Sequence, residues 1–244
     1  MVTIEDAYLE ALLRVSRQPI PECCQRDILG AIRAINPGPL PFLVSAAEDA
    51  ALPRTEVLRR IMPIFFFSCA GNLADDLSDG DCDYFDGGAR LGPSTQMILQ
   101  NLFFESLMTS GIDATSRSEA VLTLTAAVAL QHVEIRTSKW TAALFRQVAE
   151  GIAGKQWAAY LEILWSGTPL AEKAQKIGRA AAIVGHITVD IESQDVRVTT
   201  LSTPERREIL MWAADLTREL REQNLDCLQS LLAWSEPILL QANS

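Results

Sequence analysis

The feature that most constrains this chain is an apolar run that leads into a cluster of carboxylates. Residues 61–67 are all apolar, and Asp75, Asp76, Asp79 and Asp81 then place four carboxylates within seven residues. If this stretch is helical, Asp75 and Asp79 lie one turn apart on one face, with Asp76 beside them. Like charges on one face repel, and the negative end of the helix dipole adds to the repulsion. A bound cation relieves both effects, and Mg²⁺ prefers carboxylate oxygens, which it shares with phosphates. The sequence therefore predicts a site for Mg²⁺ and a diphosphate.

Two other interpretations of the acidic cluster compete with this one. A Ca²⁺ loop of the EF-hand type needs Gly at its sixth position and Glu at its twelfth, whereas a loop starting at Asp79 has Tyr84 and Arg90 there. That interpretation is excluded. A solvated acidic turn without a function stays open, because runs of charge usually lie on a surface.

Composition narrows the possible partners. The 244 residues carry a net charge of −10, which argues against nucleic-acid binding, since that needs a basic face. Five cysteines without C-x-x-C spacing predict reduced thiols and a cytoplasmic protein. The longest apolar stretch, residues 61–74, is too short to cross a bilayer and ends in carboxylates, so no transmembrane segment is expected.

Helical periodicity recurs along the whole chain, and alternating strand patterns are scarce. A single all-α domain is expected over residues 1–244, a helical bundle around a central apolar cavity, because most connections between the helices are short. Thr203 is predicted to cap the helix that follows it, with Pro204 at the first helical position. Helices are expected at residues 4–17, 22–35, 41–51, 55–77, 94–110, 116–148 with a break near Thr137, 151–165, 170–193, 205–222 and 226–240.

A second carboxylate group follows a distant apolar helix. Residues 177–189 are rich in small and apolar side chains, and Asp190 ends this stretch much as Asp75 ends the earlier one. Glu192 and Asp195 follow shortly after it. Taken alone, these three carboxylates are better explained as the start of a surface loop.

With these motifs in place, the chain resembles the trans-isoprenyl diphosphate synthases, the class I polyprenyl synthetase family. That family carries a D-D-x-x-D motif on one helix, and residues 75–79, Asp-Asp-Leu-Ser-Asp, match it completely. Its second motif, G-x-x-F-Q-x-x-D-D-x-x-D, is matched in outline. Asp190 stands for the second of the three aspartates, whereas Val189 and Ser193 replace the other two. His186 stands where the family has Gln, and Gly178 or Gly185 supplies the glycine.

The resemblance also implies roles for several cations. Lys155 lies where the family has a Lys-Thr pair, and Arg90 remains of the family's Arg-Arg after the first motif. Residues 134–139, which include Arg136 and Lys139, look similar to a run in the small bacterial prenyltransferases of moenomycin biosynthesis. Such cations would hold a diphosphate and assist its departure. For Arg136 and Lys139, ordinary surface charge is an equal alternative. The resemblance therefore implies a site with three groups of residues. The metal ligands are Asp75, Asp76, Asp79 and Asp190, and the catalytic residues are Asp75, Asp79 and Lys155. The substrate-binding residues are Arg90, Arg136, Lys139, Lys155 and His186.

The family implies an Mg²⁺-dependent reaction on an allylic prenyl diphosphate, with pyrophosphate release, in a homodimer. No G-K-R-x-R-P segment is present, so chain elongation with isopentenyl diphosphate is expected to be poor. Ala70 and Gly71 precede Asp75 where bulky side chains in the family block long tails, so a C15 or C20 substrate is expected, with Phe67 as a limit.

Two alternatives to prenyl transfer stay open. A terpene cyclase pairs D-D-x-x-D with N-D-x-x-S-x-x-x-E, and here Asp190 and Ser193 fit that motif whereas Val189 and Arg197 do not. A catalytically silent, regulatory prenyl-synthase-like subunit would explain the eroded second motif.

Overall fold

The computed structural model describes residues 2–34, 40–80, 85 and 89–242, apart from the side chain of Asp79. The secondary-structure elements of the described part are all helices, with no strand, which confirms the predicted all-α class. The chain falls into two compact units, unit 1 (Met1–Ile112) and unit 2 (Asp113–Ser244). The expectation that residues 1–244 form one domain stays a prediction.

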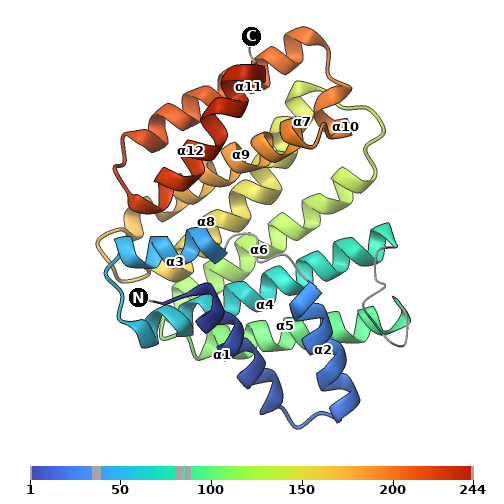
Figure 1. The fold of residues 1–244 in the computed structure, drawn as a ribbon, viewed down its shortest axis with the longest axis vertical. Coiled ribbons are helices and arrows are strands. Elements are labelled where there is room, and N and C mark those ends of the chain that lie inside the picture. Colours follow the sequence, from blue (N-terminus) through green and yellow to red (C-terminus); the bar gives the residue numbers. More distant parts are fainter. Residues whose placement is uncertain (1, 35–39, 81–84, 86–88, 243–244) are drawn as a thin grey trace. The chain divides into compact units, whose positions relative to one another are not determined.

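Unit 1 is built around one long central helix. Helix α4 (Arg54–Asp79) is enclosed on several sides rather than amphipathic, because it has completely buried side chains at Ile61, Met62, Ile64 and Phe66. It packs mainly against α5, and α1 lies across it (Figure 1). The helices of unit 1 are α1 (Ile4–Ser16), α2 (Glu22–Ala34), α3 (Leu40–Asp49), α4 (Arg54–Asp79) and α5 (Gly92–Met108), with a short 3₁₀ turn, η1 (Ala89–Leu91), before α5.

Helix α4 is long and apolar enough, by length and composition alone, to cross a membrane. However, 61% of its most apolar window is buried inside the structure, as in the core helix of a folded domain. This is weak support for a membrane span. No disulfide joins the described cysteines: Cys69 and Cys227 are buried, Cys24 is partly buried and Cys23 is exposed.

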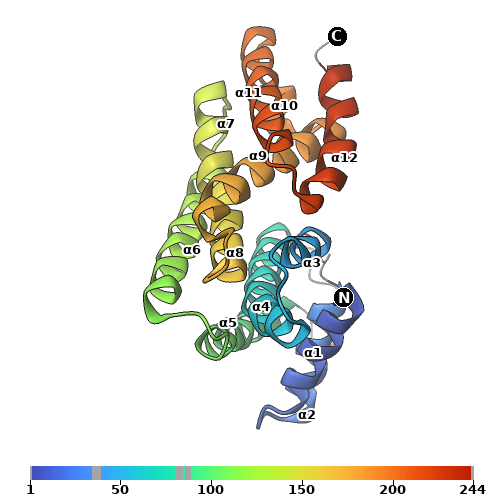
Figure 2. The same ribbon diagram turned by 90° about the vertical axis from the view of Figure 1, so that its left-hand side faces the viewer.

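Unit 2 is a layer of helices in which α8 lies between α6 and α9, while α11 and α12 pack on α9 (Figure 2). Gly178 allows the closest of these contacts, because a Cβ there would lie 2.5 Å from the carbonyl oxygen of Trp157 on α8. The elements of unit 2 are α6 (Ala114–Ile135), α7 (Ala142–Ala149), η2 (Glu150–Gly154), α8 (Lys155–Trp165), η3 (Ala171–Lys173), α9 (Ala174–Glu192), α10 (Val196–Thr199), α11 (Thr203–Arg221) and α12 (Asp226–Ala242).

The observed helices follow the expected ones to within a few residues, and the short helix α10 was not expected. The expected break near Thr137 is confirmed, since α6 ends at Ile135 and α7 begins at Ala142. The predicted cap at Thr203 is wrong by one residue: Ser202 is the N-cap of α11, and its backbone N–H donates to Glu205 Oε2 at 3.0 Å. Pro204 therefore stands one position further into the helix than predicted, where its missing N–H still costs no hydrogen bond.

Candidate functional site

The acidic motif lies at the C-terminal end of α4. Gly80 ends this helix in the left-handed conformation, with φ +83°, and its N–H donates to the carbonyl oxygen of Asp76 at 2.9 Å. Asp75 is exposed and Asp76 is half-buried, so unit 1 presents both at its surface. The predicted helical placement of residues 75–79 is confirmed. The side chain of Asp79 and all of Asp81 lie outside the described residues.

Lys155 follows a wide helical turn that the sequence did not predict. Between α7 and α8 the chain forms a π-helical segment, η2, a feature often found at functional sites. Gly151 lets this segment pack closely on α6, because a Cβ there would lie 2.0 Å from Leu130 Cδ1 and that side chain would have to move. Lys155, the first residue of α8, is exposed.

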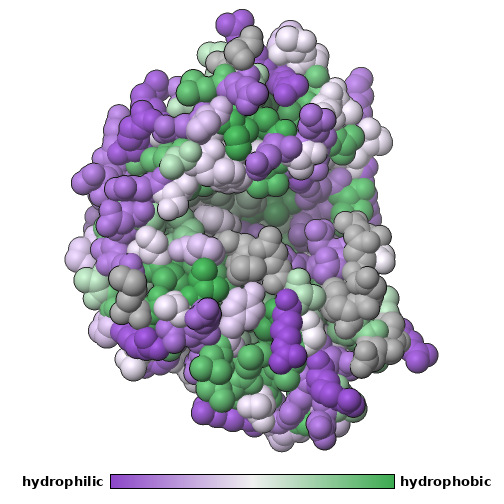
Figure 3. Space-filling model, in the orientation of Figure 1, coloured by the Kyte–Doolittle hydropathy of each residue, from purple (hydrophilic) through white to green (hydrophobic). Residues whose placement is uncertain are grey.

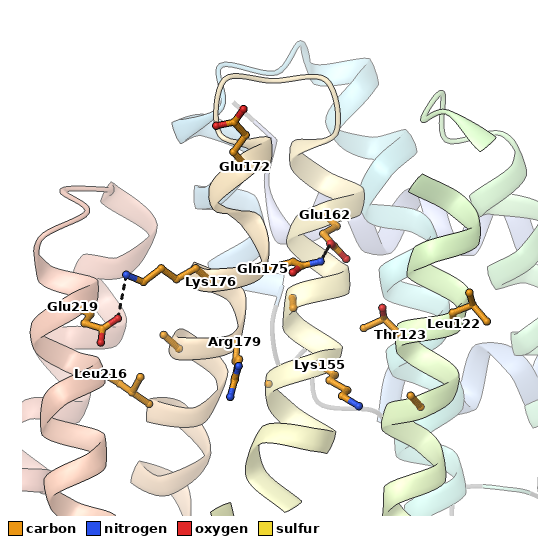
Figure 4. Close-up of a pocket in the computed structure, with 14 residues that line it drawn as sticks. Leu122, Thr123, Lys155, Glu162, Glu172, Gln175, Lys176, Arg179, Leu216 and Glu219 are labelled. Atoms are coloured by element: carbon orange, nitrogen blue, oxygen red, sulfur yellow. Dashed lines mark hydrogen bonds and ion pairs between the residues drawn. The ribbon is translucent and has the colours of Figure 1, made fainter. Parts of the chain in front are cut away.

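A pocket of about 810 Å³ lies on unit 2 beside Lys155 (Figure 4). It is lined by residues of α6, α8, α9 and α11, with apolar Leu122 and Leu216 among them. One ion pair lies within the lining, where Lys176 Nζ is 3.2 Å from Glu219 Oε2, and neutral Gln175 donates to Glu162. Lys155 adds a further cation to the lining, and His186 and Asp190 are not part of it.

The second predicted motif forms a buried cluster at the end of α9. Asp190 is fully buried, and its Oδ1 accepts a hydrogen bond of 2.8 Å from Arg197 Nη2. The same guanidinium pairs with Glu134 through Nη1 and with Asp195 Oδ1 through Nε at 3.0 Å. His186, one turn before Asp190, places its Nε2 3.5 Å from Asp190 Oδ2.

Burial dominates the protonation of this cluster. Burial, together with the nearby Arg197 guanidinium, lowers the pKa of His186 to about 3, so the imidazole is neutral at pH 7. Burial also raises the pKa of Asp190 to about 7, because the loss of hydration outweighs the attraction of Arg197. The structure thus joins His186 and Asp190, as the motif suggested, but in the interior of unit 2.

The other predicted cations lie at the ends of helices. Arg136 ends α6, Lys139 lies in the connection to α7, and Arg90 lies in η1; all three are exposed. Among the residues described, Arg136, Lys139 and Lys155 form no ion pair. Asp75 belongs to unit 1 and Asp190 to unit 2, and the expectation that the two face one cavity stays a prediction.

Two residues of the buried cluster were missed by sequence reasoning. Arg197 was noted only as a departure from the cyclase motif, and Glu134 was not singled out. Arg197 lies beyond the break between α9 and α10, so its return toward Asp190 depends on the turn at residues 193–195. Its position seven residues after Asp190, within a chain rich in carboxylates, was the only available signal.

This chain resembles known proteins in fold but not in sequence. No protein-family model and no curated protein matches it. In contrast, a geranyltranstransferase from Thermotoga maritima aligns with a TM-score of 0.73 over 97% of each chain, at 13% identity. The fold is that of the isoprenoid synthases. A geranyltransferase from Legionella pneumophila gives a TM-score of 0.69, at 13% identity, over 97% of this chain and 94% of its own.

A further structure with the isoprenoid synthase fold contains ligands. A Helicobacter pylori geranyltransferase, complexed with magnesium and isoprenyl diphosphate, aligns over 99% of this chain and 98% of its own. Its TM-score is 0.65 and its identity is 14%. At these identities the likeness establishes the fold, and the chemistry has to be argued from the residues of this chain.

Proposed function

We propose that this protein is an Mg²⁺-dependent prenyltransferase of the cytoplasm that acts on an allylic prenyl diphosphate and releases pyrophosphate. The observation that carries the proposal is the pair Asp75 and Asp76, which lies at the surface-exposed end of a buried apolar helix. Solved structures with this fold include a geranyltransferase with magnesium and isoprenyl diphosphate, which supports the same class of ligands here. The resemblance to the moenomycin prenyltransferases stays a finer prediction.

The donor set at the end of α4 fits a hard divalent cation. Carboxylate oxygens are the ligands that Mg²⁺ prefers, and it keeps positions free for water and phosphate oxygens. Asp75, Asp76 and Asp79 would hold the ion, in a chain whose only other predicted metal ligand is Asp190. When bound, Mg²⁺ neutralises the charge that develops on the leaving diphosphate.

The chain itself must bind the diphosphate, shield the cation and exclude water. Departure of pyrophosphate breaks the allylic C–O bond, and the electron pair leaves with the oxygen. The remaining carbocation forms a new bond with an acceptor, which then loses a proton. Exposed Lys155 and Arg90 supply positive charge toward a diphosphate, and Arg136 and Lys139 are further candidates.

The size of the prenyl tail is set, in this proposal, by the residues one turn before Asp75. No described atom lies within 4 Å of a Cβ built at Gly71, so the helix leaves space at that position. Phe67, one turn earlier, packs edge-on against Phe103 with ring centroids 5.3 Å apart. The open position at Gly71 leaves space for the tail of a C15 or C20 substrate, and the ring of Phe67 limits how long that tail can be.

Self-association is proposed through α5. Met97, Phe104 and Met108 are 64%, 49% and 65% exposed, and their spacing of seven and four residues puts them on one face of this helix. Figure 3 shows hydrophobic side chains exposed among hydrophilic ones on the face that it draws. A homodimer that pairs two copies of this stripe would cover it in both. Phe104→Glu should then lower the mass measured by light scattering, whereas Met211→Glu, at an exposed methionine of α11, should not.

The decisive experiment is incubation with C10, C15 and C20 allylic diphosphates and Mg²⁺, with and without isopentenyl diphosphate. Pyrophosphate release from one of the longer substrates is expected, with little extension by isopentenyl diphosphate. Asp75→Ala should lower that release by roughly 10² or more, the scale of losing a main electrostatic stabiliser. Glu48→Gln, an exposed carboxylate of α3, is the matched control and should retain full activity.

Each alternative has its own outcome in this experiment. Efficient formation of linear products with isopentenyl diphosphate would contradict the proposed substrate preference. Cyclic products without an acceptor would identify a terpene cyclase. No pyrophosphate release from any substrate would favour a silent regulatory subunit. The burial of Asp190 is consistent with that alternative, because a buried carboxylate does not reach a substrate.

A further inference from the structure

Asp190 directs both of its carboxylate oxygens at groups of its own unit. Its side chain is only 1% exposed, Oδ1 accepts from Arg197 Nη2 at 2.8 Å, and Oδ2 faces His186 Nε2 at 3.5 Å. Oδ2 makes no hydrogen bond with any described residue. The neighbouring surface position belongs to Val189, which is 50% exposed and has no donor atom. At this turn, α9 presents a hydrocarbon side chain at its surface and keeps its carboxylate inside.

Arg197 is the centre on which three carboxylates converge. Glu134 comes from the last turn of α6, Asp190 from α9, and Asp195 from the turn before α10. Asp195 also accepts from the backbone N–H of Arg197 at 2.8 Å, which fixes the start of the arginine's own helix. The planar guanidinium offers five donors in a rigid fork and suits such a partly buried position, where Arg197 is 20% exposed.

Three carboxylates around one positive group form the charge arrangement of a hard-cation site, with an arginine as the occupant. We propose that Arg197 is a permanent internal cation that stands at Asp190 in place of a metal ion. Helix α9 then contributes no metal ligand, and divalent metal binds at the α4 end alone. This inference deepens the proposed function and rests on it only for the assignment of metal to Asp75, Asp76 and Asp79.

The proposal predicts that removing the guanidinium would create a metal site. Arg197→Ala would leave Glu134, Asp190 and Asp195 without their shared counterion, in a cavity of the size that the guanidinium filled. Mn²⁺ or Mg²⁺ binds such carboxylates readily, because uncompensated charge in a partly buried position is costly. Arg197→Lys keeps the positive charge and should gain no such site.

The test is a Mn²⁺ titration of the full-length protein, with free Mn²⁺ measured by electron paramagnetic resonance. Wild type and Asp190→Asn should bind the same number of equivalents, and Asp75→Asn should bind fewer. Arg197→Ala should gain one equivalent, and its melting temperature should rise with Mn²⁺. Arg146→Ala removes a partly exposed arginine that pairs with Glu208 in the same unit, and it should match wild type.

The opposite results would overturn the proposal. Loss of an equivalent in Asp190→Asn would show that Asp190 is a metal ligand in the native protein. A folded Arg197→Ala protein with no added equivalent would show that the carboxylates do not form a cation site. If Arg197→Ala unfolds without metal, the number of Mn²⁺ equivalents bound by Asp190→Asn decides whether Asp190 is a metal ligand. A wild-type protein that binds no Mn²⁺ contradicts the proposed function instead, and a gain of binding in Arg197→Ala would still support the role of Arg197.

Discussion

The ends of α4 and α9 carry carboxylates after similar apolar stretches, yet the two ends differ in what surrounds them. At the end of α4, Asp75 and Asp76 are presented at the surface of unit 1, beside the left-handed Gly80. At the end of α9, Asp190 is buried and held by Arg197. The comparison shows that an aspartate after an apolar helix lies at the surface at one end and in the interior at the other.

The largest expected effect concerns how the two helices are packed. A Cβ at Gly178 would lie 2.5 Å from the backbone carbonyl oxygen of Trp157, which cannot move without shifting α8. At the start of α5, a Cβ at Gly92 would lie 2.4 Å from Leu77 Cδ2, the far end of a flexible side chain near the acidic motif. Gly178→Ala should therefore lower the free energy of unfolding by about 3 kcal/mol, and Gly92→Ala by about 1 kcal/mol or less.

Urea denaturation of both variants measures this difference. Gly185→Ala is a control on the same helix as Gly178, since its Cβ would meet only Leu231 Cδ1 at 3.7 Å. Equal losses for Gly178→Ala and Gly185→Ala would contradict the close contact between α8 and α9.

A second, smaller effect distinguishes the carboxylates themselves. Asp190→Asn weakens the buried hydrogen bond to Arg197 and should cost about 1 kcal/mol at pH 7. Burial raises the pKa of Asp190 to about 7, so its carboxyl is ionised in only about half of the molecules, and Arg197 keeps Glu134 and Asp195 as partners. Asp75→Asn removes one of several repelling charges at an exposed position and should change the stability by less than about 0.5 kcal/mol. Chemical denaturation at pH 7 compares the two, and a larger loss for Asp75→Asn would reverse the comparison.

A third effect is a pH dependence that arises at the α9 end. The folded-state pKa of His186 is lowered from 6.5 to about 3, so its contribution to stability is fully present above pH 6.5 and is lost as the pH falls toward 3. Between pH 6.5 and 5, wild type should lose up to about 1.4 kcal/mol per pH unit relative to His186→Gln. Parallel stability curves for the two proteins would show that His186 is not buried in its neutral form.

The sequence predicted most of the fold because the helices have local signals. The apolar run before Asp75, the glycine at position 80 and the prolines between the early helices indicate where α1 to α4 begin and end. The cap of α11 was misplaced by one residue because Ser202 and Thr203 are both good caps, and the choice depends on the reach of Glu205.

The candidate site was predictable only where it depends on spacing along one helix. Residues 75–79 lie as their spacing requires, and His186 does lie one turn before Asp190. Spacing alone could not reveal that Asp190 points inward, because this depends on an arginine beyond a helix break and on Glu134 from another helix. The π-helical turn before Lys155 was also missed. It lies where Leu130 of α6 packs against Gly151, and spacing along one helix does not reveal a contact between two helices.

The most direct test of the account is the change in melting temperature on adding Mg²⁺ and pyrophosphate together. We expect wild type and Asp190→Asn to be stabilised equally, by roughly 2.7 kcal/mol at a hundredfold excess over the dissociation constant. Asp75→Asn should show no shift. The account would be contradicted if the wild-type melting temperature did not move, or if Asp75→Asn kept the shift and Asp190→Asn lost it.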